Sequence, residues 1–374
     1  MRKFSAEDLY ATQDYCLSFD DVLLAPEYTE IRSRLSPRID SSFLRIPIIS
    51  SPMDTVTESS MAYSIGSRGA MGIIHRFMPP DDQVSELRNV IANNLAWHPI
   101  QTERDTEALS ADIRAPVVPA IGVGESERER FNYVYSSLKG DIDYVAIDIA
   151  NGHSVLMKEM IDFVNQVTGG SLKIIAGNVA TGEGFAYLAE CGVSAIRVGI
   201  GGGSICKTRI MTGFGIPTFS SIIDSYITKT KYGYNNVSII ADGGIRYPSD
   251  LAKSIVAGAD AIMAGRIFAG TLESPGEVIS YNGEKMKVYR GMASKEVQED
   301  KKGGLRKGTC AEGVSTYIPL KGKAYYVLDE FSGGLRSAMS YVNASNIEEL
   351  RSNSSFIKIT NAGLDESHAF GTKK

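Results

Sequence analysis

Eight short runs of apolar, mostly β-branched residues recur along the chain, and each ends at or beside a polar residue or a glycine. The runs lie at 46–51, 71–75, 117–122, 144–148, 173–178, 195–199, 238–242 and 261–265. Near-continuous apolar runs are typical of parallel strands that are buried on both faces. Segments with helical periodicity follow them, and eight such units predict an α/β protein whose strands close into a (β/α)8, or TIM, barrel.

The chain has room for one barrel with additions at three places. Between 75 and 116 only one amphipathic helix fits, expected over 82–97, so no second domain is predicted. The segment 277–320 is rich in Lys, Gly and Glu, which predicts a hairpin that leads into a lid over the strand ends. The single domain is expected to span 1–374, with an N-terminal arm at 1–40, a lid at about 281–325, a helix near 325–343, and a tail at about 355–374 that is exposed from 361.

Composition and charge exclude several classes of protein. Lys and Arg number 39 against 44 Asp and Glu, giving a net charge of −5, and no dense basic run provides the phosphate contacts that nucleic acids need. No apolar run approaches the roughly 20 residues that span a bilayer, and the N-terminus lacks an apolar signal core. The 4 cysteines form no CxxC pair, which argues against disulfides and structural zinc. We expect a cytoplasmic protein without nucleic-acid or membrane partners.

Polar residues at the ends of the predicted strands are candidates for function, because the carboxyl ends of barrel strands meet at one mouth. The candidates are Ser50, Ser51, His75, Asp148, Asn151, Asn178, 199–204, 242–244 and Gly265. The glycine-rich turns after the last two strands resemble backbone phosphate sites, which predicts a phosphorylated small-molecule ligand. The alternative is that these glycines only form tight turns between strand and helix.

Cys206 is the candidate nucleophile. It lies in a glycine-rich segment at 199–212, the Cys206 loop, which looks too irregular for a helix. Lys207 and Arg209 flank it, and neighbouring cations favour a reactive thiolate, while Thr208 adds a hydroxyl. A lone cysteine is more often a small buried apolar residue, which is our expectation for Cys16 and Cys191. Cys310 in the predicted lid has no expected role.

Other ionisable residues carry less weight. His75 and His153 are possible acid–base groups, but a lone histidine is more often a hydrogen-bonded structural residue. Residues 366–368 are expected to be a solvated chain end. The spacing of Asp, Glu and His matches no metal-binding pattern. From the residues alone, we infer a cysteine nucleophile that acts on an unidentified phosphorylated substrate.

Several motifs resemble the IMP dehydrogenase and GMP reductase family of purine nucleotide oxidoreductases. The motifs are LSFDDVLL at 17–24, SSPMDTVT at 50–57, the Cys206 loop, ADGG at 241–244, YRGM at 289–292 and GGLRS at 333–337. The resemblance extends over nearly the whole chain. It implies a (β/α)8 barrel, usually a homotetramer, that binds a purine nucleotide monophosphate and NAD or NADPH.

The resemblance also implies roles for individual residues. Cys206 would attack purine C2 to form a covalent intermediate. Thr208 would lie beside it and act on the group that leaves or enters at C2. The implied substrate-binding residues are Ser204, Gly244, Gly265 and Tyr289 at the phosphate, Asp242 at the ribose, and Ser51, Met53, Gly291, Met292 and Glu312 near the base. The implied cofactor-binding residues are Asp148, Asn151 and Asn178. A potassium site would combine the carbonyls of Gly201, Gly203 and Cys206 with Glu366 of a neighbouring subunit.

The sequence departs from the family pattern at two loop positions and in one larger feature. Most members have Pro where Gly202 stands, a change expected to loosen the loop. Lys207 replaces the small or apolar residue that is usual between Cys and Thr. The paired regulatory domain common in the dehydrogenases is absent, so nucleotide control through it is not expected.

The family contains two activities, which share the covalent intermediate and differ in the reaction that follows it. By resemblance, a dehydrogenase hydrolyses the intermediate with an Arg-Tyr pair on the lid, and 295–311 contains no Arg-Tyr dipeptide. The spacing from Met292 to Glu312 and the segment 148–152 resemble the reductase. We therefore predict an NADPH-dependent GMP reductase, with catalytic residues Cys206, Thr208 and Glu312. The alternative is an NAD-dependent IMP dehydrogenase, which 50–53 and 362–368 resemble.

Overall fold

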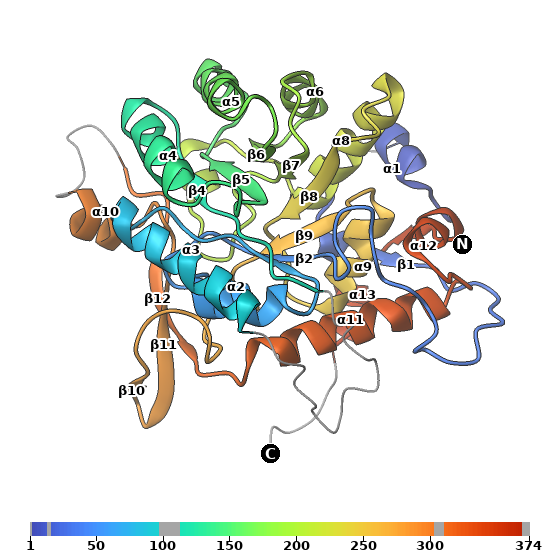
Figure 1. Ribbon diagram of the computed structural model, residues 1–374. Coiled ribbons are helices and arrows are strands. Elements are labelled where there is room, and N and C mark those ends of the chain that lie inside the picture. Colours follow the sequence, from blue (N-terminus) through green and yellow to red (C-terminus); the bar gives the residue numbers. More distant parts are fainter. Residues whose placement is uncertain (1, 13–15, 97–112, 303–309, 369–374) are drawn as a thin grey trace.

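The computed structural model describes residues 2–12, 16–96, 113–302 and 310–368, and its centre is a sheet of eight parallel strands (Figure 1). The sheet order is β3-β2-β9-β8-β7-β6-β5-β4. The strands are β2 (Ile48–Ser50), β3 (Met71–Gly72), β4 (Ala120–Ile121), β5 (Tyr144–Asp148), β6 (Lys173–Val179), β7 (Ala195–Val198), β8 (Ser238–Asp242) and β9 (Ala261–Ala264). All eight coincide with the predicted runs, so the predicted barrel is confirmed.

The barrel closes between the two end strands of the sheet, β3 and β4. A parallel bridge joins Ile74 to Pro119, and the Ala120 N–H donates to the Ile74 carbonyl at 2.8 Å. Gln83 is fully buried at this seam, and its side-chain amide donates to the carbonyls of Ala120 at 2.8 Å and His75 at 3.2 Å. One side chain thus satisfies strand carbonyls on both sides of the closure.

Helices cover the outside of the barrel (Figure 1). They are α2 (Ser59–Gly66), α3 (Pro80–Leu95), α4 (Glu125–Ser137), α5 (Val155–Thr168), α6 (Gly182–Glu190), α8 (Thr218–Tyr232), α9 (Pro248–Val256) and α11 (Ala324–Ser340). Apolar side chains of the strands fill the interior, among them Ile49, Met71, Ile175, Ile240 and Met263. The helices expected over 82–97 and 325–343 are α3 and α11. Pro80 occupies the first turn of α3, where its missing N–H costs no hydrogen bond.

The two ends of the described chain pair with each other. The N-terminal arm contains α1 (Ala6–Thr12), a short 3-10 helix (Phe19–Asp21) and β1 (Val22–Leu24). β1 pairs antiparallel with β13 (Phe356–Lys358), which lies between α12 (Ile347–Asn353) and α13 (Asn361–Glu366). Phe356 is fully buried, so the tail predicted from about 355 begins as a packed strand. The side chains of residues 365–368 are exposed, as expected.

The lid is more ordered than a hairpin. β10 (Ile279–Tyr281), β11 (Glu284–Arg290) and β12 (Ser315–Pro319) form an antiparallel sheet, with α10 (Lys295–Lys302) between the last two strands. The Cys206 loop also differs from the prediction, because it contains the short helix α7 (Thr208–Thr212). This helix ends at Gly213, whose φ of 78° lies in the left-handed region that glycine adopts readily.

Candidate active site

A cavity of about 520 Å³ opens where the carboxyl ends of the barrel strands meet the lid. Sixteen of the predicted site residues line it: Ser51, Met53, Asp148, Asn178, Gly201, Gly203, Ser204, Cys206, Thr208, Asp242, Gly244, Gly265, Tyr289, Gly291, Met292 and Glu312. Two predicted residues lie elsewhere. Asn151 is exposed, and its side chain accepts the His153 N–H, while Glu366 is exposed at the end of α13.

Cys206, Thr208 and Glu312 form a hydrogen-bonded chain. The Cys206 thiol donates to Thr208 Oγ1 at 3.2 Å, and the same hydroxyl donates to Glu312 Oε2 at 2.7 Å. Thr208 begins α7, and Glu312 belongs to the lid. A thiol, a hydroxyl and a carboxylate in this order can move a proton between the sulfur or an atom beside it and the carboxylate.

Backbone hydrogen bonds hold the Cys206 loop against the lid. The Lys207 N–H donates to the Glu312 carbonyl at 2.6 Å, and the Val314 N–H donates to the Ile205 carbonyl at 3.1 Å. These two bonds bracket Cys206, and an isolated bridge joins it to Gly313. The position of the thiol therefore depends on the lid as well as on the barrel.

Lys207 and Arg209, the two cations predicted beside the thiol, have different surroundings in the structure. The Arg209 guanidinium donates to the carbonyl of Ile200 at 3.1 Å and to that of Ile216, so it braces the two ends of the loop. Lys207 has an exposed side chain. Arg209 thus stabilises the backbone of the loop, because carbonyl groups without partners would be costly to bury.

Arg197 connects two carboxylates inside the barrel mouth. Its guanidinium pairs with Asp148 at the end of β5 and, at 2.8 Å, with Asp242 at the end of β8. Asn178 donates to the same Asp242 oxygen at 2.7 Å and to the Gly199 carbonyl at 2.7 Å. Burial alone would lower the pKa of Arg197, but its two ion pairs outweigh burial and raise it. The network fixes two carboxylates at the ends of strands that are separated by β6 and β7.

Small residues and hydroxyls surround the other end of the cavity. A Cβ on Gly265 would lie 2.9 Å from the Tyr289 hydroxyl and 3.0 Å from Met53 Sδ, so only glycine leaves this space open. The hydroxyls of Ser204 and Tyr289 are 3.4 Å apart, and burial raises the pKa of Tyr289. Backbone and neutral hydroxyl groups in such an arrangement suit a phosphate.

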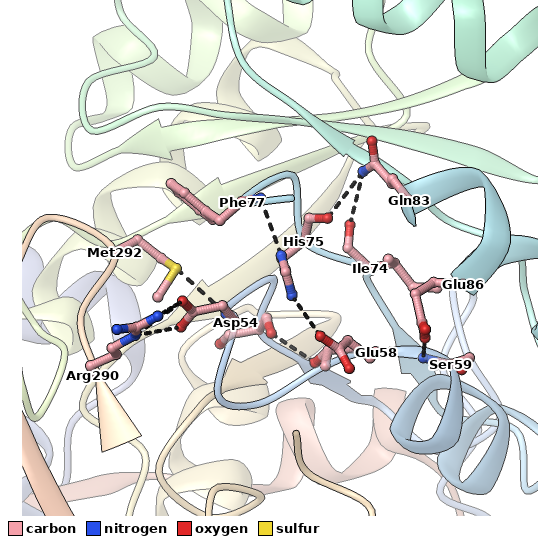
Figure 2. A network of polar contacts seen from close by, with 12 residues as sticks. Asp54, Glu58, Ser59, Ile74, His75, Phe77, Gln83, Glu86, Arg290 and Met292 are labelled. Atoms are coloured by element: carbon pink, nitrogen blue, oxygen red, sulfur yellow. Dashed lines mark hydrogen bonds and ion pairs between the residues drawn. The ribbon is translucent and has the colours of Figure 1, made fainter. Parts of the chain in front are cut away.

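A second polar network supports the lid next to the cavity (Figure 2). Asp54 is 7% exposed, pairs with Arg290 of β11 at 2.7 Å, and directs its own N–H toward Met292 Sδ at 3.5 Å. The ion pair thereby ties the loop after β2 to the segment that carries Gly291 and Met292 into the cavity. Asp54 and Arg290 had no role in the sequence-based prediction.

His75 lies between Glu58 and Phe77 and bonds to both (Figure 2). It is 2% exposed, its Nε2 lies 3.3 Å from Glu58 Oε1, and its Nδ1 accepts the Phe77 N–H at 3.1 Å. It does not line the cavity. Both ring nitrogens have partners, which agrees with the structural interpretation. His153 lies against the ring of Tyr187 with centroids 4.9 Å apart.

The other cysteines, Cys16, Cys191 and Cys310, differ in how deeply they are buried. Cys191 is half-buried, and burial raises the pKa of its thiol. Cys310 is exposed. The expectation that Cys16 is buried is wrong, because the adjacent Leu17 points inward, 2% exposed, and leaves Cys16 facing solvent. His98, expected at the surface, and Arg306, expected in the lid, lie outside the described residues.

The described residues contain neither a candidate metal cluster nor a candidate membrane-spanning helix. No group of three or more His, Cys, Asp or Glu side chains is placed to hold a metal ion in the part of the chain that the structure describes. Within the same ranges, no helix combines the length and the apolar character needed to cross a membrane.

Arg197 and Thr218 line the cavity without having been predicted as site residues. The signal for Arg197 is visible in the sequence, since a lone charge stands in the apolar run 195–199. A charge in a strand buried on both faces requires a partner. Thr218 gives no such signal, because a threonine at the start of a helix is ordinary.

A family model described as the IMP dehydrogenase / GMP reductase domain matches residues 16–370. The chain belongs to this family. It is therefore an oxidoreductase of the family that the motifs predicted. The full-length match and the barrel together confirm the predicted family and fold.

Relatives with assigned activities are similar along almost their whole length. Inosine-5'-monophosphate dehydrogenases from Borreliella burgdorferi and Cryptosporidium parvum are each 36% identical, over 400 and 390 residues, and each alignment covers 94% of this chain. They are covered to 96% and 94% of their own lengths. The enzyme from Aquifex aeolicus is 32% identical over 475 residues, with 94% of both chains covered. These names agree better with the predicted alternative than with GMP reductase.

Proposed function

We propose that the protein is an IMP dehydrogenase that oxidises IMP to XMP with NAD through a covalent adduct on Cys206. The observation that carries the covalent mechanism is the chain Cys206–Thr208–Glu312, whose hydrogen bonds of 3.2 and 2.7 Å lie at the wall of the cavity. The direction of the reaction is supported by the names of the relatives.

The first half of the reaction forms the adduct. The Cys206 sulfur attacks C2 of the purine, and the thiol proton passes to solvent. NAD, when bound, supplies the acceptor for the hydride that leaves C2. Asp148 and Asn178 line the cavity on the side of β5 and β6, where they would orient the nicotinamide together with Asn151.

The second half releases the product. Water attacks C2 of the adduct, its proton passes through Thr208 to Glu312, and the C2–sulfur bond breaks to free the thiolate. The balance is IMP, NAD⁺ and water giving XMP, NADH and a proton. The Thr208–Glu312 pair thus supplies a base for hydrolysis that requires no Arg-Tyr pair on the lid.

The remaining cavity residues would bind the nucleotide. Asp242 would accept hydrogen bonds from the ribose hydroxyls. Ser204, Tyr289 and the backbone at Gly244 and Gly265 would surround the phosphate, because this end of the cavity combines hydroxyls with space next to the backbone. The base-binding set would be Ser51, Met53, Gly291, Met292 and Glu312.

GMP reductase is the second candidate, and the lid sequence favours it. No Arg-Tyr dipeptide occurs in 295–311, and the same proton path can run in reverse. Glu312 would deliver a proton through Thr208 to the leaving 2-amino group, and NADPH, when bound, would supply the hydride for C2. The products would be IMP, ammonia and NADP⁺.

The test supplies the purified protein with IMP and NAD in one assay and with GMP and NADPH in the other. We expect XMP and NADH from the first pair at the higher kcat/KM. Faster production of IMP and ammonia from the second pair would reject the dehydrogenase and establish the reductase. Activity with neither pair would reject both.

We also propose a homotetramer with a potassium site at the Cys206 loop. Carbonyl oxygens are ligands that potassium prefers, and the loop offers those of Gly201, Gly203 and Cys206. The Gly203 carbonyl accepts the Cys206 N–H at 3.1 Å, which leaves its second lone pair for an ion. Glu366 of a neighbouring subunit would complete the site. Potassium should raise activity above that in sodium, and deletion of 365–374 should remove the difference; equal rates in both salts would reject the site.

A further inference from the structure

The hydroxyl of Thr218 is buried at the cavity wall without a hydrogen-bond partner. Thr218 is the first residue of α8, is 5% exposed, and lines the cavity. Its Oγ1 bonds to nothing among the described residues. An unpaired buried hydroxyl is costly, so its persistence at a functional site calls for a partner in some state of the protein.

Glycines of two loops create the space that this hydroxyl occupies. A Cβ on Gly202 would lie only 2.5 Å from Thr218 Oγ1, and a Cβ on Gly244 would lie 4.0 Å from it. A Cβ on Gly199 would lie 3.3 Å from Thr218 Cγ2. The hydroxyl therefore fits beneath the Cys206 loop only because residue 202 has no side chain.

The part of the loop above Thr218 is the part that other contacts hold least. The lid bonds to Ile205 and Lys207, and Arg209 bonds to the Ile200 carbonyl. The segment 201–204 between these anchors contains three glycines in succession. Three glycines in succession give the segment high backbone freedom, so a single added hydrogen bond can restrict it.

We propose that Thr218 is a positioning residue for the Cys206 loop. As the Cys206 sulfur attacks a bound nucleotide, the Thr218 hydroxyl forms a hydrogen bond to the loop backbone at Gly202 or Gly203 and holds the sulfur in place. This inference rests on the proposed role of Cys206. Gly202 and Thr218 are thus a fitted pair. The glycine leaves space for the hydroxyl, and the hydrogen bond from the hydroxyl restricts the backbone that the glycine leaves free.

The same helix provides a matched control. Ser221 and Ser225 are also fully buried, and their hydroxyls also lack partners among the described residues. Neither residue lines the cavity. If buried hydroxyls on α8 mattered only for packing, removal of any of them would have a similar effect.

The main experiment compares Thr218→Val, Thr218→Ser and Ser221→Ala in the full chain. The measurements are kcat, the rate of the first turnover, the affinity for IMP and the midpoint of thermal unfolding. Thr218→Val should lower kcat and the first-turnover rate about tenfold, the effect of one ordinary hydrogen bond. IMP affinity should change less than about twofold, and the melting midpoint should not fall, because the hydroxyl has no partner until the sulfur attacks. Thr218→Ser should recover most of the lost rate, and Ser221→Ala should match the wild type.

A double-mutant cycle tests the fit between the two residues. Gly202→Ala should slow turnover in the wild-type background because its methyl group meets the Thr218 hydroxyl. It should add little in the Thr218→Ala background, where that contact is gone. Additive effects of the two substitutions would contradict the fitted pair.

Two results would overturn the inference. One is a wild-type first-turnover rate in Thr218→Val, and the other is an equal loss of rate and stability in Thr218→Val and Ser221→Ala. A separate variant distinguishes this failure from failure of the proposed function. If Cys206→Ala is inactive while Thr218→Val is unaffected, only the positioning role is wrong; if Cys206→Ala is active, the proposed covalent mechanism is wrong.

Discussion

The hydroxyl of Thr208 donates to the carboxylate of Glu312 across 2.7 Å, and this bond joins the Cys206 loop to the lid. The backbone of the same two segments is also connected, since the Lys207 N–H donates to the Glu312 carbonyl. Glu312 therefore has two tasks, to align the loop through its main chain and to exchange a proton through its side chain. A substitution that changes only the carboxylate separates them.

Glu312→Gln should impair hydrolysis and spare hydride transfer. The amide keeps the shape of the side chain but cannot accept a proton from water, and general-base assistance is typically worth about 10² to 10⁴-fold. With IMP and NAD, we expect a rapid first equivalent of NADH followed by a steady rate at least about 10²-fold lower. Glu296→Gln, an exposed lid carboxylate outside the cavity, is the control and should behave as wild type. A slowed first turnover would show that Glu312 acts earlier than proposed.

Arg197→Met should destabilise the barrel and weaken nucleotide binding together. It leaves Asp148 and Asp242 without their shared cation, and removal of one member of a buried ion pair costs about 3 to 5 kcal/mol. Arg128→Met removes two longer ion pairs near the surface and a cation–π contact with Phe163, and it should cost less than Arg197→Met. Urea denaturation measures both. Equal stability of the two variants would mean that the carboxylates do not depend on Arg197.

Stability above neutral pH should depend on Lys321. Its ammonium donates to the carbonyls of Arg266 at 2.7 Å and Ile267 at 3.0 Å, and burial, with the nearby Arg266 charge, lowers its pKa to about 8. The unfolded chain retains the usual value of 10.5, so between about pH 8 and 10.5 it binds more protons than the native state. This residue therefore adds stability as the pH rises through that window.

The test is the difference in unfolding free energy between wild type and Lys321→Met as a function of pH. The difference should grow in favour of the wild type from pH 8 upward and level off near 10.5. Lys323→Met, at an exposed neighbour, is the control for the loss of a surface lysine. A difference independent of pH would mean that Lys321 is not held in a buried site.

The sequence predicts the barrel because strands buried on both faces produce apolar runs that are visible without structure. It also predicts the mouth, since strand ends converge by topology, and 16 of the predicted residues do line one cavity. Local patterns contain less information about contacts between distant segments. The pairing of β1 with β13 joins two strands of three residues each, which are too short to give a recognisable pattern, so the packed start of the tail was missed.

Contacts between individual side chains that are distant in the chain could not be predicted for the same reason. Gly202 was expected to loosen its loop, and only the structure shows that the missing side chain accommodates Thr218. Arg197 can be recognised in the sequence as a charge within a predicted strand. Its partners are known only from the structure, which places β5 and β8 on either side of β6 and β7. The direction of hydride transfer depends on chemistry that both members of the family share, which is why the lid sequence and the named relatives favour different activities.

The most direct test of the account is turnover by Cys206→Ala compared with Cys310→Ala. Both thiols are exposed, and only Cys206 lines the cavity. We predict that Cys206→Ala binds IMP with nearly unchanged affinity but forms no NADH, because the nucleophile acts after binding. Cys310→Ala should retain wild-type turnover. More than about a tenth of wild-type activity in Cys206→Ala, a barrier change below about 1.4 kcal/mol, would contradict covalent catalysis at this thiol.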